Sequence, residues 1–172
     1  MMYTGYNKRK YITNMEEIMK RNRFFLFFLI VYGFMSSMLM AQSNTIIDSL
    51  LNEKKADMGQ TVYMVLSAAS MIDDSVDVPG ALAALKKEQW PGFKTVEASD
   101  TLSYGEYSFL LMKAFGLSGG VLYHFLPGPR YAVRELKYRG FVDAGTDPHQ
   151  KISGDDVVRI LGYVLDWKEG RK

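Results

Sequence analysis

The stretch TLSYGEYSFLLMKAFGL at 101–117 is matched in pattern by KISGDDVVRILGYVLDW at 151–167, and this pair decides the fold. At an offset of 50 residues, each copy has an apolar residue, a serine, an acid three positions later and an apolar helical face. The serine and the acid are typical of a capping box, in which each side chain satisfies a backbone N–H at a helix start. A period in this range is typical of stacked helical units, although amphipathic helices also share such caps by chance. The predicted helix caps are Ser103 with Glu106, and Ser153 with Asp156.

The two copies resemble the S-layer homology (SLH) module, whose repeats begin with a helix announced by an Ile-Thr-Arg-Ala-Glu type motif. The matching segments are LSYGE at 102–106 and ISGDD at 152–156, and the resemblance covers about residues 100–167. It implies two helix-loop-helix units and a protein that docks on cell-wall polysaccharide. Tyr104 and Gly154 stand at the positions of the motif arginine, which family members use in docking. The chain therefore departs from the family at a binding residue.

Four further helices are predicted from apolar periodicity and from residues that start or stop helices. They cover residues 44–55, 60–72, 79–87 and 129–139. The run 90–100 contains a Pro-Gly pair and no helical period, and it is predicted to be a connector. With the two repeat helices, the sequence predicts a small, mainly α domain of about six helices.

An apolar run, FFLFFLIVYGF at 24–34, follows three bases, Lys20, Arg21 and Arg23. A positive flank followed by an apolar segment is the order of a secretory signal. The first 18 residues are polar and long for the basic region of such a signal, so we expect translation to start at Met19. Residues 1–43 are predicted to be a leader and signal peptide.

The signal closes on Met40-Ala41-Gln42-Ser43, in which Ala41 and Ser43 fit the small-x-small rule of signal peptidase. This predicts cleavage before Asn44, with cleavage after Ala41 as the competing choice. An uncleaved anchor is the alternative, because residues 24–41 are about long enough to span a bilayer.

Composition limits what the mature chain can do. Residues 1–43 hold six of the 21 Lys and Arg and two of the 19 Asp and Glu, so residues 44–172 carry 15 bases and 17 acids, a charge of −2. Nucleic-acid binding needs a concentrated basic face, and that class of function is set aside. Cysteine is absent, which excludes a disulfide framework and a cysteine-ligated zinc site. Residues 44–172 are predicted to form one mostly helical domain.

We identify no catalytic, metal or cofactor site in the sequence. Residues 116–120, GLSGG, spell the nucleophile-elbow pattern, but that elbow needs a strand before the serine and a helix is predicted there. Residues 145–156 resemble a calcium loop, yet Gln150 replaces its obligatory glycine. The two histidines, His124 and His149, are not at metal-ligand spacing. We therefore predict no catalytic residue, no metal and no cofactor.

The segment FLPGPRY at 125–131 is the strongest candidate for a binding surface. Two prolines stiffen it, so its side chains are displayed at small entropic cost. Arg130 falls at a helix start, where the macrodipole disfavours a cation unless an acid compensates; an internal salt bridge is the alternative interpretation. The stretch 119–136 also resembles segments of uncharacterised exported spirochaetal proteins, which implies a periplasmic setting. The predicted partner-binding residues are Tyr123, His124, Arg130, Tyr131 and Arg134.

These observations favour an exported periplasmic or envelope-associated, non-enzymatic module that binds an envelope protein or a cell-wall polymer. Membrane contact is expected only through the signal segment, if it is uncleaved. A hydrolase of envelope polymers is the alternative, because paired carboxylates need no local sequence motif. A structural accessory domain without a ligand is a third hypothesis.

Overall fold

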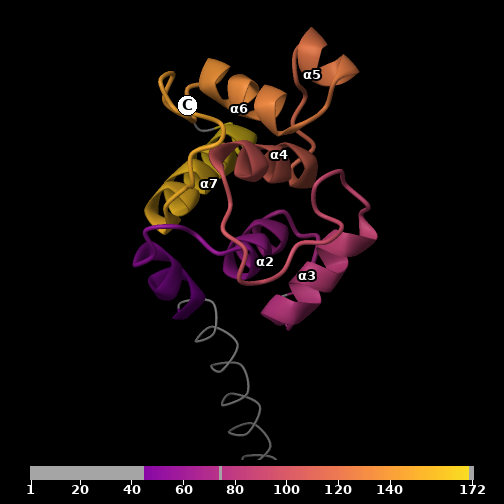
Figure 1. Ribbon diagram of the computed structural model, residues 1–172, viewed down its shortest axis with the longest axis vertical. Coiled ribbons are helices and arrows are strands. Elements are labelled where there is room, and N and C mark those ends of the chain that lie inside the picture. The colour runs from indigo at the N-terminus through magenta and orange to yellow at the C-terminus, as the bar shows by residue number, and fades with distance from the viewer. Residues whose placement is uncertain (1–44, 74, 171–172) are drawn as a thin grey trace, which may run out of the picture. The chain divides into compact units, whose positions relative to one another are not determined.

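The computed structural model of the protein describes residues 45–73 and 75–170. Within these ranges the fold is mainly helical, as predicted, and the β-structure is limited to two isolated bridges. The predicted leader, its Met19 start and cleavage before Asn44 lie outside the described residues. A helical segment covers residues 45–51. The helices in Figure 1 are α2 (Met58–Ala68), α3 (Val78–Lys87), α4 (Tyr104–Ala114), α5 (Val121–Phe125), α6 (Pro129–Tyr138) and α7 (Gly154–Lys168).

Three residues that lie two positions before a helix meet in a closed ring of backbone hydrogen bonds. The N–H of Ala56 donates to the carbonyl of Ile152 (2.8 Å), the N–H of Ile152 donates to the carbonyl of Leu102 (3.1 Å), and the N–H of Leu102 donates to the carbonyl of Ala56 (3.2 Å). All three residues are fully buried. Each is followed directly by the N-cap of a helix, namely α2, α4 or α7. The ring therefore brings three equivalent helix starts together.

The sequence pattern predicted two units, and the ring adds a third. Ala56 lies 46 residues before Leu102 and takes the same place in the ring. Asp57, the next residue, caps α2 by accepting a 2.7 Å hydrogen bond from the N–H of Gln60. The unit that begins at Ala56 was not recognised from the repeat pattern. It carries alanine and aspartate where the other two units carry a large aliphatic residue and serine.

A second set of backbone hydrogen bonds joins the first residue of each of these helices to a neighbouring connector. The first N–H groups of a helix have no partner inside it, so these bonds satisfy donors that would otherwise be unpaired in the interior. The connectors are thereby fixed to a neighbouring unit. The donors and acceptors are Met58 with Asp100 (2.7 Å), Tyr104 with Gln150 (3.0 Å), and Gly154 with Glu53 (3.0 Å).

Some predicted helix bounds were wrong. The helix predicted at 44–55 ends at residue 51, because the backbone groups of Glu53 and Ala56 bond to Gly154 and Ile152 at the start of α7. The helix predicted at 60–72 is α2, which begins earlier, at its cap, and ends before Ser70, whose φ of 56° is left-handed. The five-residue helix α5 was not predicted. The connector at 90–100 is confirmed as non-helical, and α3 and α6 lie within a residue of their predicted bounds.

The core is centred on α4, which packs between α6 and α2 (Figure 1). Its side chains Tyr107, Phe109, Leu110 and Leu111 are fully buried. The ring of Phe93, from the connector at 90–100, lies parallel to that of Phe109 with their centroids 6.0 Å apart. The irregular connector is therefore anchored in the core by an aromatic contact.

Candidate functional site

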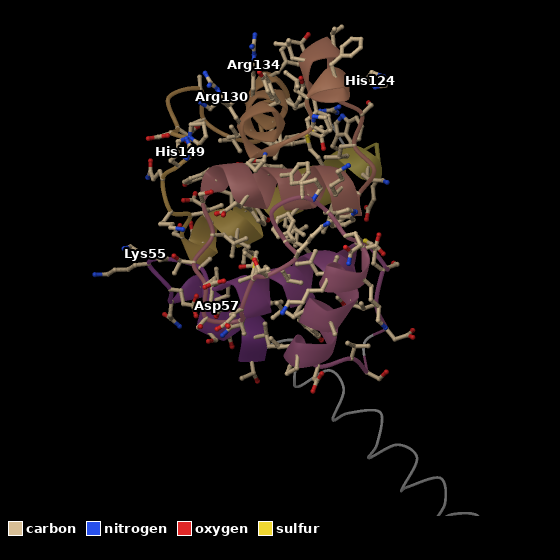
Figure 2. The ribbon with its side chains drawn as sticks, turned by 45° about the vertical axis from the view of Figure 1, so that its right-hand side comes forward. Lys55, Asp57, His124, Arg130, Arg134 and His149 are labelled. Atoms are coloured by element: carbon tan, nitrogen blue, oxygen red, sulfur yellow. The ribbon has the colours of Figure 1, made fainter. Side chains whose placement is uncertain are left out.

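The predicted binding residues lie on α5 and α6. These two helices are at the end of the helical domain that is remote from α2 and α3 (Figures 1 and 2). His124, Arg130 and Arg134 are exposed, and Tyr131 is half-buried against the core. We call these four residues the α5–α6 surface, within which His124 lies on the other side of α5 from the two arginines in the view of Figure 2. Among the described residues, neither Arg130 nor Arg134 forms an ion pair, so the internal salt bridge considered as the alternative is not present there.

Tyr123 does not share this exposure. Its residue is 9% exposed, and its ring meets that of Phe109 edge-on, with centroids 6.4 Å apart. Burial, with a contribution from the charge of Glu135, raises the pKa of its phenol. The expectation that Tyr123 is displayed on the surface is wrong, because α5 turns this side chain inward.

The sequence reasoning missed the apolar side chains that α5 turns outward. Val121 is 73% exposed, Leu122 44%, Phe125 74% and Leu126 57%. We call these four residues the α5 tip. They are half of the large hydrophobic residues that are exposed in the described part of the chain. The signal was present as an apolar run next to Gly119-Gly120, but such a run is more often a buried segment.

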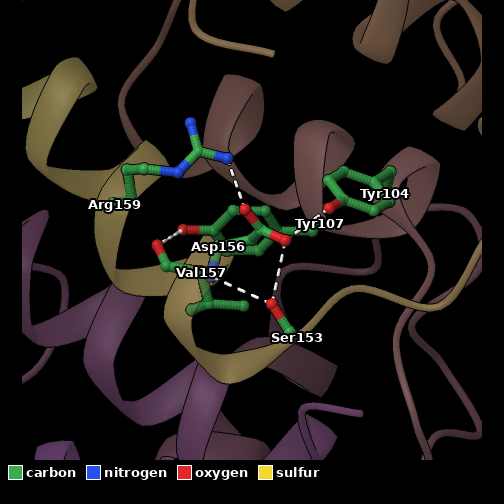
Figure 3. A network of polar contacts seen from close by, with 6 residues as sticks. All are labelled: Tyr104, Tyr107, Ser153, Asp156, Val157 and Arg159. Atoms are coloured by element: carbon green, nitrogen blue, oxygen red, sulfur yellow. Dashed lines mark hydrogen bonds and ion pairs between the residues drawn. The ribbon is translucent and has the colours of Figure 1, made fainter. Parts of the chain in front are cut away.

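A polar network joins the starts of α4 and α7 (Figure 3). The hydroxyl of Tyr104 donates a 2.6 Å hydrogen bond to the carboxylate of Asp156, which also accepts from Ser153 (2.8 Å) and pairs with Arg159. Burial alone would raise the pKa of Asp156, but the hydrogen bonds from these three residues outweigh it and lower that pKa. A general acid needs the opposite shift, so the arrangement suits a structural carboxylate.

The predicted caps take part in this local structure. Ser103 and Glu106 form the full capping box: the Ser103 Oγ accepts from the N–H of Glu106, and a Glu106 carboxylate oxygen accepts from the N–H of Ser103 at 2.7 Å. Ser153 caps α7 by accepting from the N–H of Asp156. The Asp156 carboxylate, however, turns to Tyr104 and Arg159 instead of completing a second box.

Another pair of carboxylates lies at the start of α2. A carboxylate oxygen of Glu53 accepts from the N–H of Asp57 at 2.9 Å, while Asp57 caps the helix. Burial raises the pKa of Glu53, and the charge of Asp57 adds to that effect against the opposing backbone hydrogen bond. Both side chains thus have capping roles.

An open groove with a volume of about 470 Å³ lies beside the C-terminal ends of α6 and α7. The guanidinium of Arg139 lies 4.6 Å from the ring centroid of Trp167 and donates to the carbonyl of Ser118. Ser118, the serine of the nucleophile-elbow pattern, follows helix α4, as expected. It is one of the residues that line the groove. The lining residues are Ser118, Gly119, Gly120, Glu135, Tyr138, Arg139 and Trp167.

Within the described ranges, no three His, Asp or Glu side chains are grouped so that they could hold a metal ion. Across residues 45–73 and 75–170, no helix combines the length and the apolar character needed to cross a bilayer. The remaining histidine, His149, is exposed, and its backbone N–H donates to the carboxylate of Asp147 at 2.9 Å.

Comparison with protein-family models, curated proteins and solved structures finds no match for this chain.

Proposed function

We propose that the protein is an exported, envelope-associated, non-enzymatic module that binds a partner protein or a cell-wall polymer through the α5–α6 surface. Export is supported by the bases at Lys20 to Arg23, the apolar run at 24–34 and the small residues Ala41 and Ser43. The SLH resemblance of the two capped repeats supports a wall polymer as partner, although the motif arginine is absent.

The observation that carries the proposal is the pair of exposed arginines on α6. Arg130 occupies the first turn, where the helix dipole disfavours a cation, and that turn holds no acidic residue. Arg134 lies one turn further, on the same helical face. Neither has an ion-pair partner among the described residues. Arginine and aromatic side chains dominate interface energies, so this face is suited to an anionic group of a partner.

Two captures with the immobilised protein test the proposal. The first uses native envelopes after chemical cross-linking, and the second uses purified sacculi. A protein partner predicts a specific cross-linked product from envelopes and no retention of sacculi; a polymer partner predicts retention of sacculi. If both captures are negative under low and moderate salt, the protein is not a binding module of this kind.

A further inference from the structure

The α5 tip is an exposed apolar surface on a helix that projects from the described fold (Figure 1). Its four side chains lie on or next to a single five-residue helix, and α5 packs mainly on α6 (Figure 1). Taking about 200 Å² for each large side chain, the exposed fractions leave roughly 400–500 Å² of apolar surface. A standard protein interface buries about 800 Å² per partner. The tip alone is therefore too small for a stable protein–protein contact.

Basic residues outnumber acidic ones in the stretch of sequence around the tip. No Asp or Glu occurs from Tyr107 to Arg134, whereas this stretch contains Lys113, Arg130 and Arg134. The next residue, Glu135, is an acid that lies close to α5, because its carboxylate lies against Gly120, which directly precedes the helix. Exposed apolar side chains with arginines on the neighbouring helix are a combination that binds the interface of a bilayer containing anionic lipids.

We propose that the α5 tip inserts into the interfacial region of an anionic lipid bilayer, with Arg130 and Arg134 against the headgroups. Interfacial segments bury an apolar face about 5–10 Å deep, and the α5 tip presents such a face to solvent. A lipid surface accommodates a projecting apolar helix without a preformed cavity, whereas a protein partner would need a matching groove. The inference rests on the α5–α6 surface of the proposed function. It departs from the expectation that only the signal segment meets the membrane.

The test places a tryptophan at the tip of the full chain. Phe125→Trp is compared with Met71→Trp, whose position is 37% exposed and lies after α2. Both proteins keep Trp90 and Trp167 as an equal background. Each is mixed with vesicles of phosphatidylcholine alone or of phosphatidylcholine and phosphatidylglycerol in equal parts, with brominated acyl chains as quenchers. Quenching of the tryptophan at position 125 reports how deeply the α5 tip enters the bilayer. Attachment of the chain through residues 24–34 would not by itself quench that tryptophan.

The expected result is a blue shift and strong quenching for Phe125→Trp on the anionic vesicles, weaker quenching on neutral ones, and no change for Met71→Trp. A second pair of variants measures partitioning into the anionic vesicles. Leu122→Ser/Phe125→Ser should reduce this partitioning by roughly tenfold or more relative to Leu51→Ser/Met71→Ser, since only the first pair removes exposed apolar area of the α5 tip, which the bilayer would bury.

Three outcomes overturn the inference. Equal quenching of both reporters, or none, shows that the tip does not enter the bilayer. Self-association that is lost in Leu122→Ser/Phe125→Ser, without quenching, means that a second copy covers the tip. Retention of sacculi or of a cross-linked protein without quenching refutes the lipid inference and leaves the proposed function standing, whereas failure of the captures as well refutes both.

Discussion

The phenol of Tyr104 on α4 donates a 2.6 Å hydrogen bond to the carboxylate of Asp156 on α7, 52 residues away, and so joins the starts of the two helices. The resemblance to the SLH module, which stays a prediction, aligns Tyr104 with the arginine of that motif. In this chain Tyr104 connects the units that begin at α4 and α7 through its hydrogen bond to Asp156. The hydroxyl of Tyr107 adds a second link, a 2.6 Å hydrogen bond to the carbonyl of Val157 in the buried interior.

Tyr104→Phe should lower the free energy of unfolding by about 1–2 kcal/mol at neutral pH, because a hydrogen bond to a charged group is removed. The folded-state pKa of Asp156 is lowered, so its contacts stabilise the fold above its unfolded pKa and lose that effect as pH falls through the folded value. The loss caused by Tyr104→Phe should therefore shrink in acid. Urea unfolding at neutral pH and at about pH 2 measures this; an equal loss at both pH values would contradict the assignment.

The three helix caps should respond alike. Ser103→Ala, Ser153→Ala and Asp57→Ala should each cost on the order of 1 kcal/mol, because each removes the acceptor for a helix N–H. Glycine at the same positions should cost only a few tenths, which provides the matched control. If all three alanine variants melt like the wild type in denaturant, the unit boundaries at these caps are misplaced.

Gly154→Ala should destabilise the protein by at least about 3 kcal/mol. A Cβ there would lie 1.6 Å from the carbonyl oxygen of Leu50, a clash with backbone that no rotamer relieves. Gly162→Ala, in the same helix with no atom within 4 Å of the added Cβ, should instead stabilise by roughly 0.5–1 kcal/mol. Thermal unfolding of both variants checks the pair. A tolerated alanine at 154 would mean that the segment 45–51 does not pack on the start of α7.

Export predicts a processed N-terminus. Mass spectrometry of the protein isolated from its native envelope should find the first residue within a few positions of Asn44, because Ala41 and Ser43 fit the signal peptidase rule. A mature protein that retains residues 24–34 would be an anchored one.

The sequence predicted what local chemistry determines. The caps at Ser103 and Ser153 follow from short-range hydrogen bonds between a side chain and the nearby backbone. The ring through Ala56 could not be predicted, because backbone hydrogen bonds between distant segments leave no residue-type signature. The orientation of α5 is a similar case. Tyr123 and Phe125 are both apolar aromatics in one run, and only packing on Phe109 decides which of them is buried.

The most direct test of the proposed binding surface compares Arg130→Ala/Arg134→Ala with Lys86→Ala/Lys87→Ala. Both variants remove two exposed positive charges from one helix, and only the first alters the α5–α6 surface. Exposed arginines contribute little to folding, so both thermal midpoints should stay near that of the wild type. Capture of the envelope partner should fall sharply for the arginine variant alone. Unchanged capture with an unchanged midpoint would contradict the proposed surface, and a midpoint lowered by many degrees would show that the arginines serve the fold.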